Sequence, residues 1–129
     1  MAITQAVCDS FKKELLEGEH DFRSSGGDQF KLALYGSSAS LSNTTTAYTT
    51  SQEVSASGTY SAGGGNLTST GAAATNNTSF IDFSDISFTS ASISAQAAVI
   101  YNSNTTATTN TNAAVMAVSY THLTLPTKA

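Results

Sequence analysis

Histidine and carboxylate side chains are the groups of this chain best suited to acid–base or metal chemistry, and they meet at one place in the sequence. His20 is flanked by Glu17, Glu19 and Asp21. Such carboxylates could complete a weak cation site with the imidazole. A single histidine among loop carboxylates is more typical of a solvated turn, so we expect a turn here and no metal.

The other reactive residue types give no stronger motif. Asp82 and Asp85 could serve calcium or acid–base chemistry, but their spacing on a strand favours outward or turn positions. Cys8 is the only cysteine, so it is expected to be a small buried hydrophobic residue. The glycines of residues 62–65 lack the Lys-Ser/Thr of a phosphate-binding loop and predict a turn. We therefore predict no catalytic residue, no metal and no cofactor, and a protein that is not an enzyme.

Tyrosines are the remaining candidates for ligand contact. A tyrosine offers a flat apolar ring with a polar tip, which suits a carbohydrate-binding surface. Tyr48 and Tyr60 lie in polar, turn-rich segments and are the candidate ligand contacts. The alternative is that these tyrosines lie at the rim of the core, because they are spread along separate predicted strands.

Length and charge exclude several classes of protein. The 129 residues suit one domain, and 11% of them are charged, with a net charge of −4. Five Lys and Arg against nine Asp and Glu leave no broad basic face, so we expect no nucleic-acid partner. No apolar run approaches the length that spans a bilayer, so we expect no membrane segment. A basic-then-apolar leader is also missing from the first residues, so we expect the protein to be made in a cytoplasm and to reach any later destination without an export signal of its own.

An apolar stripe near the start of the chain predicts an amphipathic helix. Its members recur every four residues and are the candidate interface residues Ile3, Val7, Phe11 and Leu15. The helix is predicted over about residues 4–17, with Thr4 as N-cap and Gly18 closing its end. The stripe could dock on the chain's own sheet, as a lid over the core, or on a neighbouring subunit.

The rest of the chain predicts strands. Alternation places one strand at about residues 29–35, others within residues 80–102, including one with Ile86 and Phe88, and a last one from Ala113. Between Ala91 and Tyr101 the pattern begins half exposed and ends apolar on both faces. Residues 71–79 are predicted as a loop. The fold class is mainly β: an antiparallel β-sandwich or open barrel with one N-terminal helix.

The C-terminal residues differ from the rest. Residues 118–127 read VSYTHLTLPT and resemble the translation of a sequencing adapter of the tagmentation type. We therefore expect a single β-rich domain over residues 1–117, cut short relative to its natural form, and a non-native tail over residues 118–129. Because the loss of terminal strands exposes a sheet edge, we expect residues 1–117 alone to aggregate.

Several segments resemble a family of small proteins encoded by tailed bacteriophages from marine and freshwater viromes. They are MAITQAVCDSFKKELLEGEHDF, FKLALYGSSASL, TTAYTTSQEVS, GTYSAGGGNL and DFSDISFTSASISAQAAVIYNS. The resemblance implies a virion structural protein, a head-decoration or tail-associated subunit made in the host cytoplasm. Its partners would be further copies of itself or other virion proteins. The alternative is a module of the tail or receptor-binding apparatus that binds host-surface glycan through Tyr48 and Tyr60.

Overall fold

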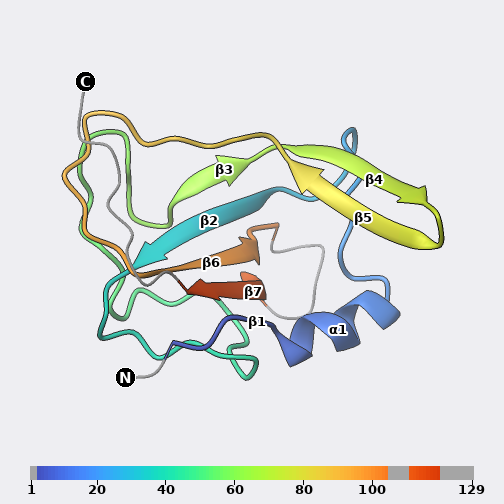
Figure 1. The fold of residues 1–129 in the computed structure, drawn as a ribbon, viewed down its shortest axis with the longest axis horizontal. Coiled ribbons are helices and arrows are strands. Elements are labelled where there is room, and N and C mark those ends of the chain that lie inside the picture. The colour runs from blue at the N-terminus through green and yellow to red at the C-terminus, as the bar shows by residue number, and fades with distance from the viewer. Residues whose placement is uncertain (1–2, 105–110, 120–129) are drawn as a thin grey trace.

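The computed structural model describes residues 3–104 and 111–119, and these contain a five-stranded antiparallel sheet and a separate hairpin (Figure 1). The sheet order is β1-β7-β6-β2-β3. Its strands are β1 (Ala6–Val7), β7 (Ala113–Ser119), β6 (Ala97–Asn102), β2 (Phe30–Tyr35) and β3 (Gly65–Leu67). The hairpin consists of β4 (Ser69–Thr75) and β5 (Thr78–Phe83), and the helix is α1 (Asp9–Leu16). The prediction of a mainly β, antiparallel fold is confirmed; the sheets are sandwich-like and do not close into a barrel.

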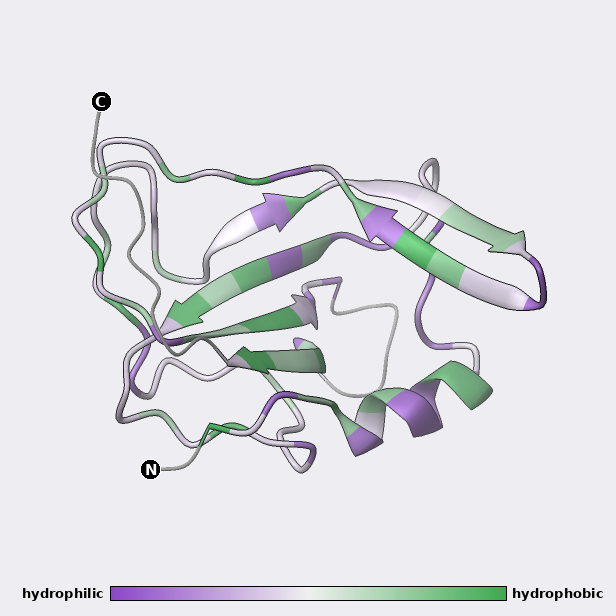
Figure 2. Ribbon diagram, in the orientation of Figure 1, coloured by the Kyte–Doolittle hydropathy of each residue, from purple (hydrophilic) through white to green (hydrophobic). Residues whose placement is uncertain are grey.

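The central strands β2 and β6 have side chains buried on both faces. Alternate residues of a strand point to opposite faces. Ala33 and Val99 pair across the two strands and belong to one core cluster, whereas Leu34 and Ala98 pair next to them and belong to a second. Hydrophobic residues accordingly dominate β6 and β7 in Figure 2. The sheet is therefore covered on both faces, as a sandwich-like fold requires.

The predicted burial pattern before and within β6 is confirmed. Buried Ala91, Ile93 and Ala95 alternate with exposed Ser92 and Ser94. From residue 97 onward both faces are buried, apart from a half-buried residue 100. The regular strand begins only at residue 97, so the alternation of burial extends further than the hydrogen-bonded ladder.

The predicted start of the helix is wrong, and its predicted end is right. The amide of Thr4 donates to the carbonyl of Leu41 at 2.8 Å, and the helix begins only after Cys8. Residues 6–7 instead pair with β7, because the outer edge of β7 needs hydrogen-bond partners. Gly18 has a φ of +73° and its amide donates to Leu15, while residue 19 donates to Glu14, which is a Schellman closure.

Within the described residues no helix has the length and apolar character needed to cross a membrane.

Residues 71–79 were predicted to be a loop, and this prediction is wrong. They form most of a β-hairpin. Asn76 and Asn77 form its two-residue turn, with φ values of +51° and +67°. Positive φ at both turn positions is typical of the type I′ turn, which matches the twist of paired strands. The run of alanines in β4 has low strand propensity and concealed the strand. Conversely, Ile86 and Phe88 lie outside any strand and pack their side chains on the two core clusters.

The last two described residues extend β7. Val118 lies opposite Ala98 and Ser119 opposite Ala97. The remainder of the tail that was expected to be non-native, residues 120–129, lies outside the described residues.

Candidate functional site

An apolar groove of about 370 Å³ is lined by α1, the hairpin and β7. Its walls include the side chains of Val7, Phe11, Leu15, Phe80, Ile81, Val115 and Met116. None of its lining residues is charged. Such a surface can hold another apolar surface by the hydrophobic effect, but it offers no group for bond chemistry.

The groove contains three of the four residues predicted as an interface. Phe11 is buried in its floor, whereas Val7 is 41% exposed and Leu15 is 46% exposed. Ile3 lies elsewhere, bridged to Leu41 and packed on the core. Phe11 therefore packs the helix on the chain's own core, while Val7 and Leu15 are exposed at the groove; their contact with a neighbouring subunit stays a prediction.

Exposed apolar side chains gather at this groove. Among the described residues the large hydrophobic side chains that are exposed are Val7, Leu15, Leu16 and Phe80. Three of them line the groove, and Leu16, which is 91% exposed, follows Leu15 in the last turn of α1. Large apolar residues that cluster on a surface mark interaction sites, whereas single scattered ones do not.

The hairpin's share of this surface was missed from the sequence. Phe80 and Ile81 reach the groove because β5 folds back on β4 at the Asn76–Asn77 turn. That dipeptide, flanked by residues that can form strands, was the available signal. The side on which a hairpin packs is not encoded in its turn, so this signal alone would not have placed Phe80 at the same groove as the helix.

The cluster around His20 is a buried polar network, not the solvated turn that was predicted. The imidazole is fully buried, and its Nε2 lies 2.8 Å from Oε1 of Glu14. The side-chain amide of Asn102 lies 3.1 Å from Nδ1 and also donates to Asp28 at 2.8 Å. Because an amide nitrogen is a donor, Nδ1 accepts and the proton lies on Nε2, which donates to Glu14. The ring also lies 4.9 Å from the ring of Phe11, so the network connects α1 to the end of β6.

This network is arranged for structure rather than for chemistry at the surface. Both nitrogens of His20 are engaged, and the Asn102 carbonyl oxygen accepts from the amide of Asn104 at 2.9 Å. Among the described residues there is no group of three or more His, Cys, Asp or Glu that could hold a metal ion. Asp82 and Asp85 are both exposed, as expected.

The two candidate ligand tyrosines meet at Glu53. Tyr48 donates to Oε1 at 2.6 Å and Tyr60 donates to Oε2 at 2.7 Å, where the amide of Gly63 also donates at 2.8 Å. Tyr60 is 1% exposed and its hydroxyl accepts from the amide of Leu34 at 2.9 Å. Its ring is therefore part of the core and presents no face to a ligand in this structure.

Tyr48 is only partly buried, but its ring is also occupied by the protein. It stacks on the ring of Tyr101 with centroids 4.7 Å apart. Burial raises the pKa of Tyr48, and its hydrogen bond to Glu53 adds to the rise. Both features hold the neutral phenol in place within the tyrosine network, which we define as Tyr35, Tyr48, Tyr60 and Tyr101.

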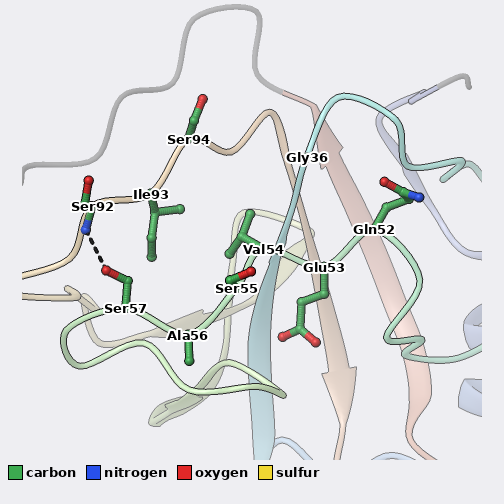
Figure 3. Close-up of a pocket in the computed structure, with 10 residues that line it drawn as sticks. All are labelled: Gly36, Gln52, Glu53, Val54, Ser55, Ala56, Ser57, Ser92, Ile93 and Ser94. Atoms are coloured by element: carbon green, nitrogen blue, oxygen red, sulfur yellow. Dashed lines mark hydrogen bonds between the residues drawn. The ribbon is translucent and has the colours of Figure 1, made fainter.

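A polar depression of about 470 Å³ lies on another part of the surface (Figure 3). It is lined by four serines, Ser55, Ser57, Ser92 and Ser94, together with the apolar side chains of Val54 and Ile93. The amide of Ser92 donates to Oγ of Ser57 at 2.9 Å, which joins its two walls. None of the residues that line it is aromatic.

Comparisons with known proteins do not assign the chain to a family. No protein-family model, no curated protein and no solved structure matches it. The resemblance to small tailed-phage proteins therefore stays a prediction. The apolar groove between α1, the hairpin and β7 is the main basis for a functional proposal.

Proposed function

We propose that this protein is a structural subunit that acts through protein–protein contacts, as a head-decoration or tail-associated component of a tailed-phage virion. The observation that carries the proposal is the clustering of the exposed side chains of Val7, Leu15 and Phe80 at one apolar groove. Keeping these three large apolar side chains in water costs free energy, and a partner surface that covers them recovers it.

The distribution of polar groups supports a structural role. The titratable groups with the most distinctive surroundings, His20 with Glu14 and Glu53 with its tyrosines, are engaged inside the protein. Charged side chains on the helix surface pair with one another, as Lys13 does with Glu17 at 2.9 Å. These groups stabilise the fold and leave the groove as the most distinctive surface of the described residues.

The assignment to a virion rests on the resemblance to phage proteins, and it has a direct test. Particles of a phage that encodes this chain would be purified through a density gradient and digested for peptide mass spectrometry. We expect peptides from residues 3–104 to co-purify with the major capsid and tail proteins in fixed proportion. Their absence from infectious particles, with presence in the infected lysate, would contradict the virion assignment.

A second candidate function is the recognition of host-surface glycan, which the polar depression supports. Its serine hydroxyls could bond sugar hydroxyls while Val54 and Ile93 contact an apolar sugar face. A glycan array tests this idea, with Ser94→Tyr to fill the depression and Ser38→Tyr as a control at an exposed position outside it. Binding that Ser94→Tyr abolishes and Ser38→Tyr retains would support it; an array without signal would contradict it.

A further inference from the structure

We propose that His20 makes the docking of α1 sensitive to acid: the neutral imidazole holds the C-terminal end of the helix against β6, and protonation of its Nδ1 releases that end. Leu15, near the same end of the helix, lines the apolar groove, so release changes the shape of the groove. The effect does not depend on which partner the groove binds.

The orientation of the Asn102 side chain determines which form of His20 fits the docked helix. The Asn102 amide nitrogen donates to Oδ2 of Asp28 at 2.8 Å, and its carbonyl oxygen accepts from the amide of Asn104 at 2.9 Å. Turning this group over would place its oxygen against a carboxylate and its nitrogen against an N–H group. The nitrogen therefore faces His20, 3.1 Å from Nδ1, and a proton on Nδ1 would set two donors against each other.

The other hydrogen-bond partner of His20 does not cancel this effect, because it is close in the chain. Glu14 lies six residues before His20, and its Oε1 lies 2.8 Å from Nε2. An imidazolium can keep that contact as an ion pair whether or not the end of the helix is docked. The contact with Asn102 spans 82 residues and belongs to the docked state alone. Because protonation removes this hydrogen bond from the docked state and nothing equivalent from the released state, acid favours release.

Aromatic rings and carboxylates surround the imidazole. The rings have centroids 4.9, 6.4 and 6.2 Å from that of the imidazole, and they belong to Phe11, Phe22 and Phe30. The carboxylates are Glu14, which contacts the ring directly, and Asp28, which faces it through the Asn102 amide. The flanking residues Glu19 and Asp21 are acidic as well. None of these groups is a cation, so the conflict with the Asn102 amide is what opposes a charged imidazole in the docked state.

The start of α1 is held by separate contacts. The amide of Cys8 donates to the carbonyl of Val115 at 2.9 Å, and the amide of Asp9 donates to the carbonyl of Asn43 at 2.8 Å. The side-chain amide of Asn43 donates in return to the Asp9 carboxylate at 2.8 Å. None of these contacts involves a histidine. We therefore expect the C-terminal end of the helix, with Leu15, to move about a start that stays in place.

Hydrogen exchange of the full 129-residue chain tests the inference at about pH 7.5 and at about pH 5, on either side of the range in which histidine ordinarily takes up a proton. With rates corrected for the pH dependence of exchange itself, we expect the protection of residues 13–20 to fall at least about tenfold in acid, while β2 and β6 keep theirs. Nitrogen-15 NMR of the imidazoles, with His122→Gln to assign the two histidines, should show Nδ1 of His20 gaining its proton as this protection falls.

His20→Gln is the matched variant. A glutamine amide can donate to Glu14 and accept from Asn102, as the neutral imidazole does, but it takes up no proton in this range. We expect the protection of residues 13–20 in this variant to be the same at both pH values. If the variant does not fold, the parent chain decides, because its imidazole titration and its loss of protection must coincide.

Three results would overturn the inference. They are protection of residues 13–20 that is unchanged at about pH 5, a loss of protection that does not follow the His20 titration, and an equal loss in His20→Gln. The last two would assign the acid response to a carboxylate.

Discussion

At the scale of residues, this protein uses its reactive side chains to hold segments together. His20 connects α1 to β6 through Glu14 and Asn102, and Glu53 gathers two tyrosines and a backbone amide. A buried polar group stabilises a fold only when its hydrogen-bond partners are present. Both clusters meet that condition for the groups named.

Removing Asn102 should therefore be strongly destabilising. Asn102→Ala takes away the donor to His20 and Asp28 and the acceptor for the amide of Asn104. We expect the free energy of unfolding to fall by about 2–4 kcal/mol, because buried polar groups lose their partners. Urea denaturation followed by circular dichroism measures the change, with Ser38→Ala as an exposed control. A loss as small as that of the control would contradict the structural importance of the network.

Cys8 should be inert in the native protein. Its side chain is fully buried, and this burial is the main reason why the pKa of its thiol is raised to about 11. The negative charges of Asp9 and Glu14 add to the rise. The thiolate is the reactive form, so alkylation by iodoacetamide near neutral pH should be slow in buffer and fast in denaturant. Mass spectrometry against time gives both rates. Equal rates in the two conditions would show that the segment before α1 opens readily.

At the scale of elements, short local signals end the helix and reverse the hairpin. Gly18 closes α1 in the left-handed conformation, and Asn76 and Asn77 turn the chain between β4 and β5. Both positions need positive φ, which glycine and asparagine adopt at low cost. The hairpin matters functionally because it forms one wall of the groove.

Asn77→Gly should stabilise the hairpin. Asn-Gly is the preferred pair for a type I′ turn, and φ at residue 77 is +67°. We expect the free energy of unfolding to rise by about 0.5 kcal/mol, because the relief of the left-handed conformation at residue 77 exceeds the entropy cost of glycine. Asn66→Gly is the matched control, since residue 66 lies within β3, where glycine weakens a strand and should lower stability. The two thermal melts should shift in opposite directions; shifts of the same sign would contradict the turn assignment.

At the scale of the whole molecule, the tyrosine network joins the long segment between β2 and β3 to the sheet. The hydroxyl of Tyr35 donates to the carbonyl of Thr49 at 2.6 Å, and that of Tyr101 donates to the carbonyl of Gly63 at 2.5 Å. Burial raises the pKa of each tyrosine in the network. For Tyr101 the value rises from 10.0 to about 12, with a contribution from Glu53.

The protein should therefore lose stability in alkali. A raised pKa in the folded state means that the unfolded chain releases its phenol protons first, so the stabilisation is complete below about pH 10 and falls as the pH rises toward 12. Urea denaturation at about pH 9 and at about pH 11 should show this fall. The slope should be smaller in Tyr101→Phe, which keeps the ring and removes the titrating group. A free energy of unfolding that is constant over this range would contradict the prediction.

Much of the architecture could be predicted because local pattern and tertiary environment agree there. Residues 30–35 alternate and form β2, the burial pattern from Ala91 to Tyr101 is as expected, and Gly18 ends the helix. The shared position of Val7, Phe11 and Leu15 at the groove was predictable for the same reason, and their role as an interface stays a prediction. The packing of Ile3 on the core and the burial of Tyr60 were not predictable, because both depend on segments that are distant in sequence.

By itself, the amino-acid sequence determined a mainly β, weakly charged domain with a short helix near its start, since composition and periodicity act over neighbouring residues. Only the tertiary structure decided where α1 begins, that residues 69–83 form a hairpin, and that Phe80 and Leu15 line the same groove. The physical reason is that a backbone segment adopts the state in which its hydrogen bonds are satisfied by whatever lies next to it. For residues 6–7 the free edge of β7 outweighed the helical pattern.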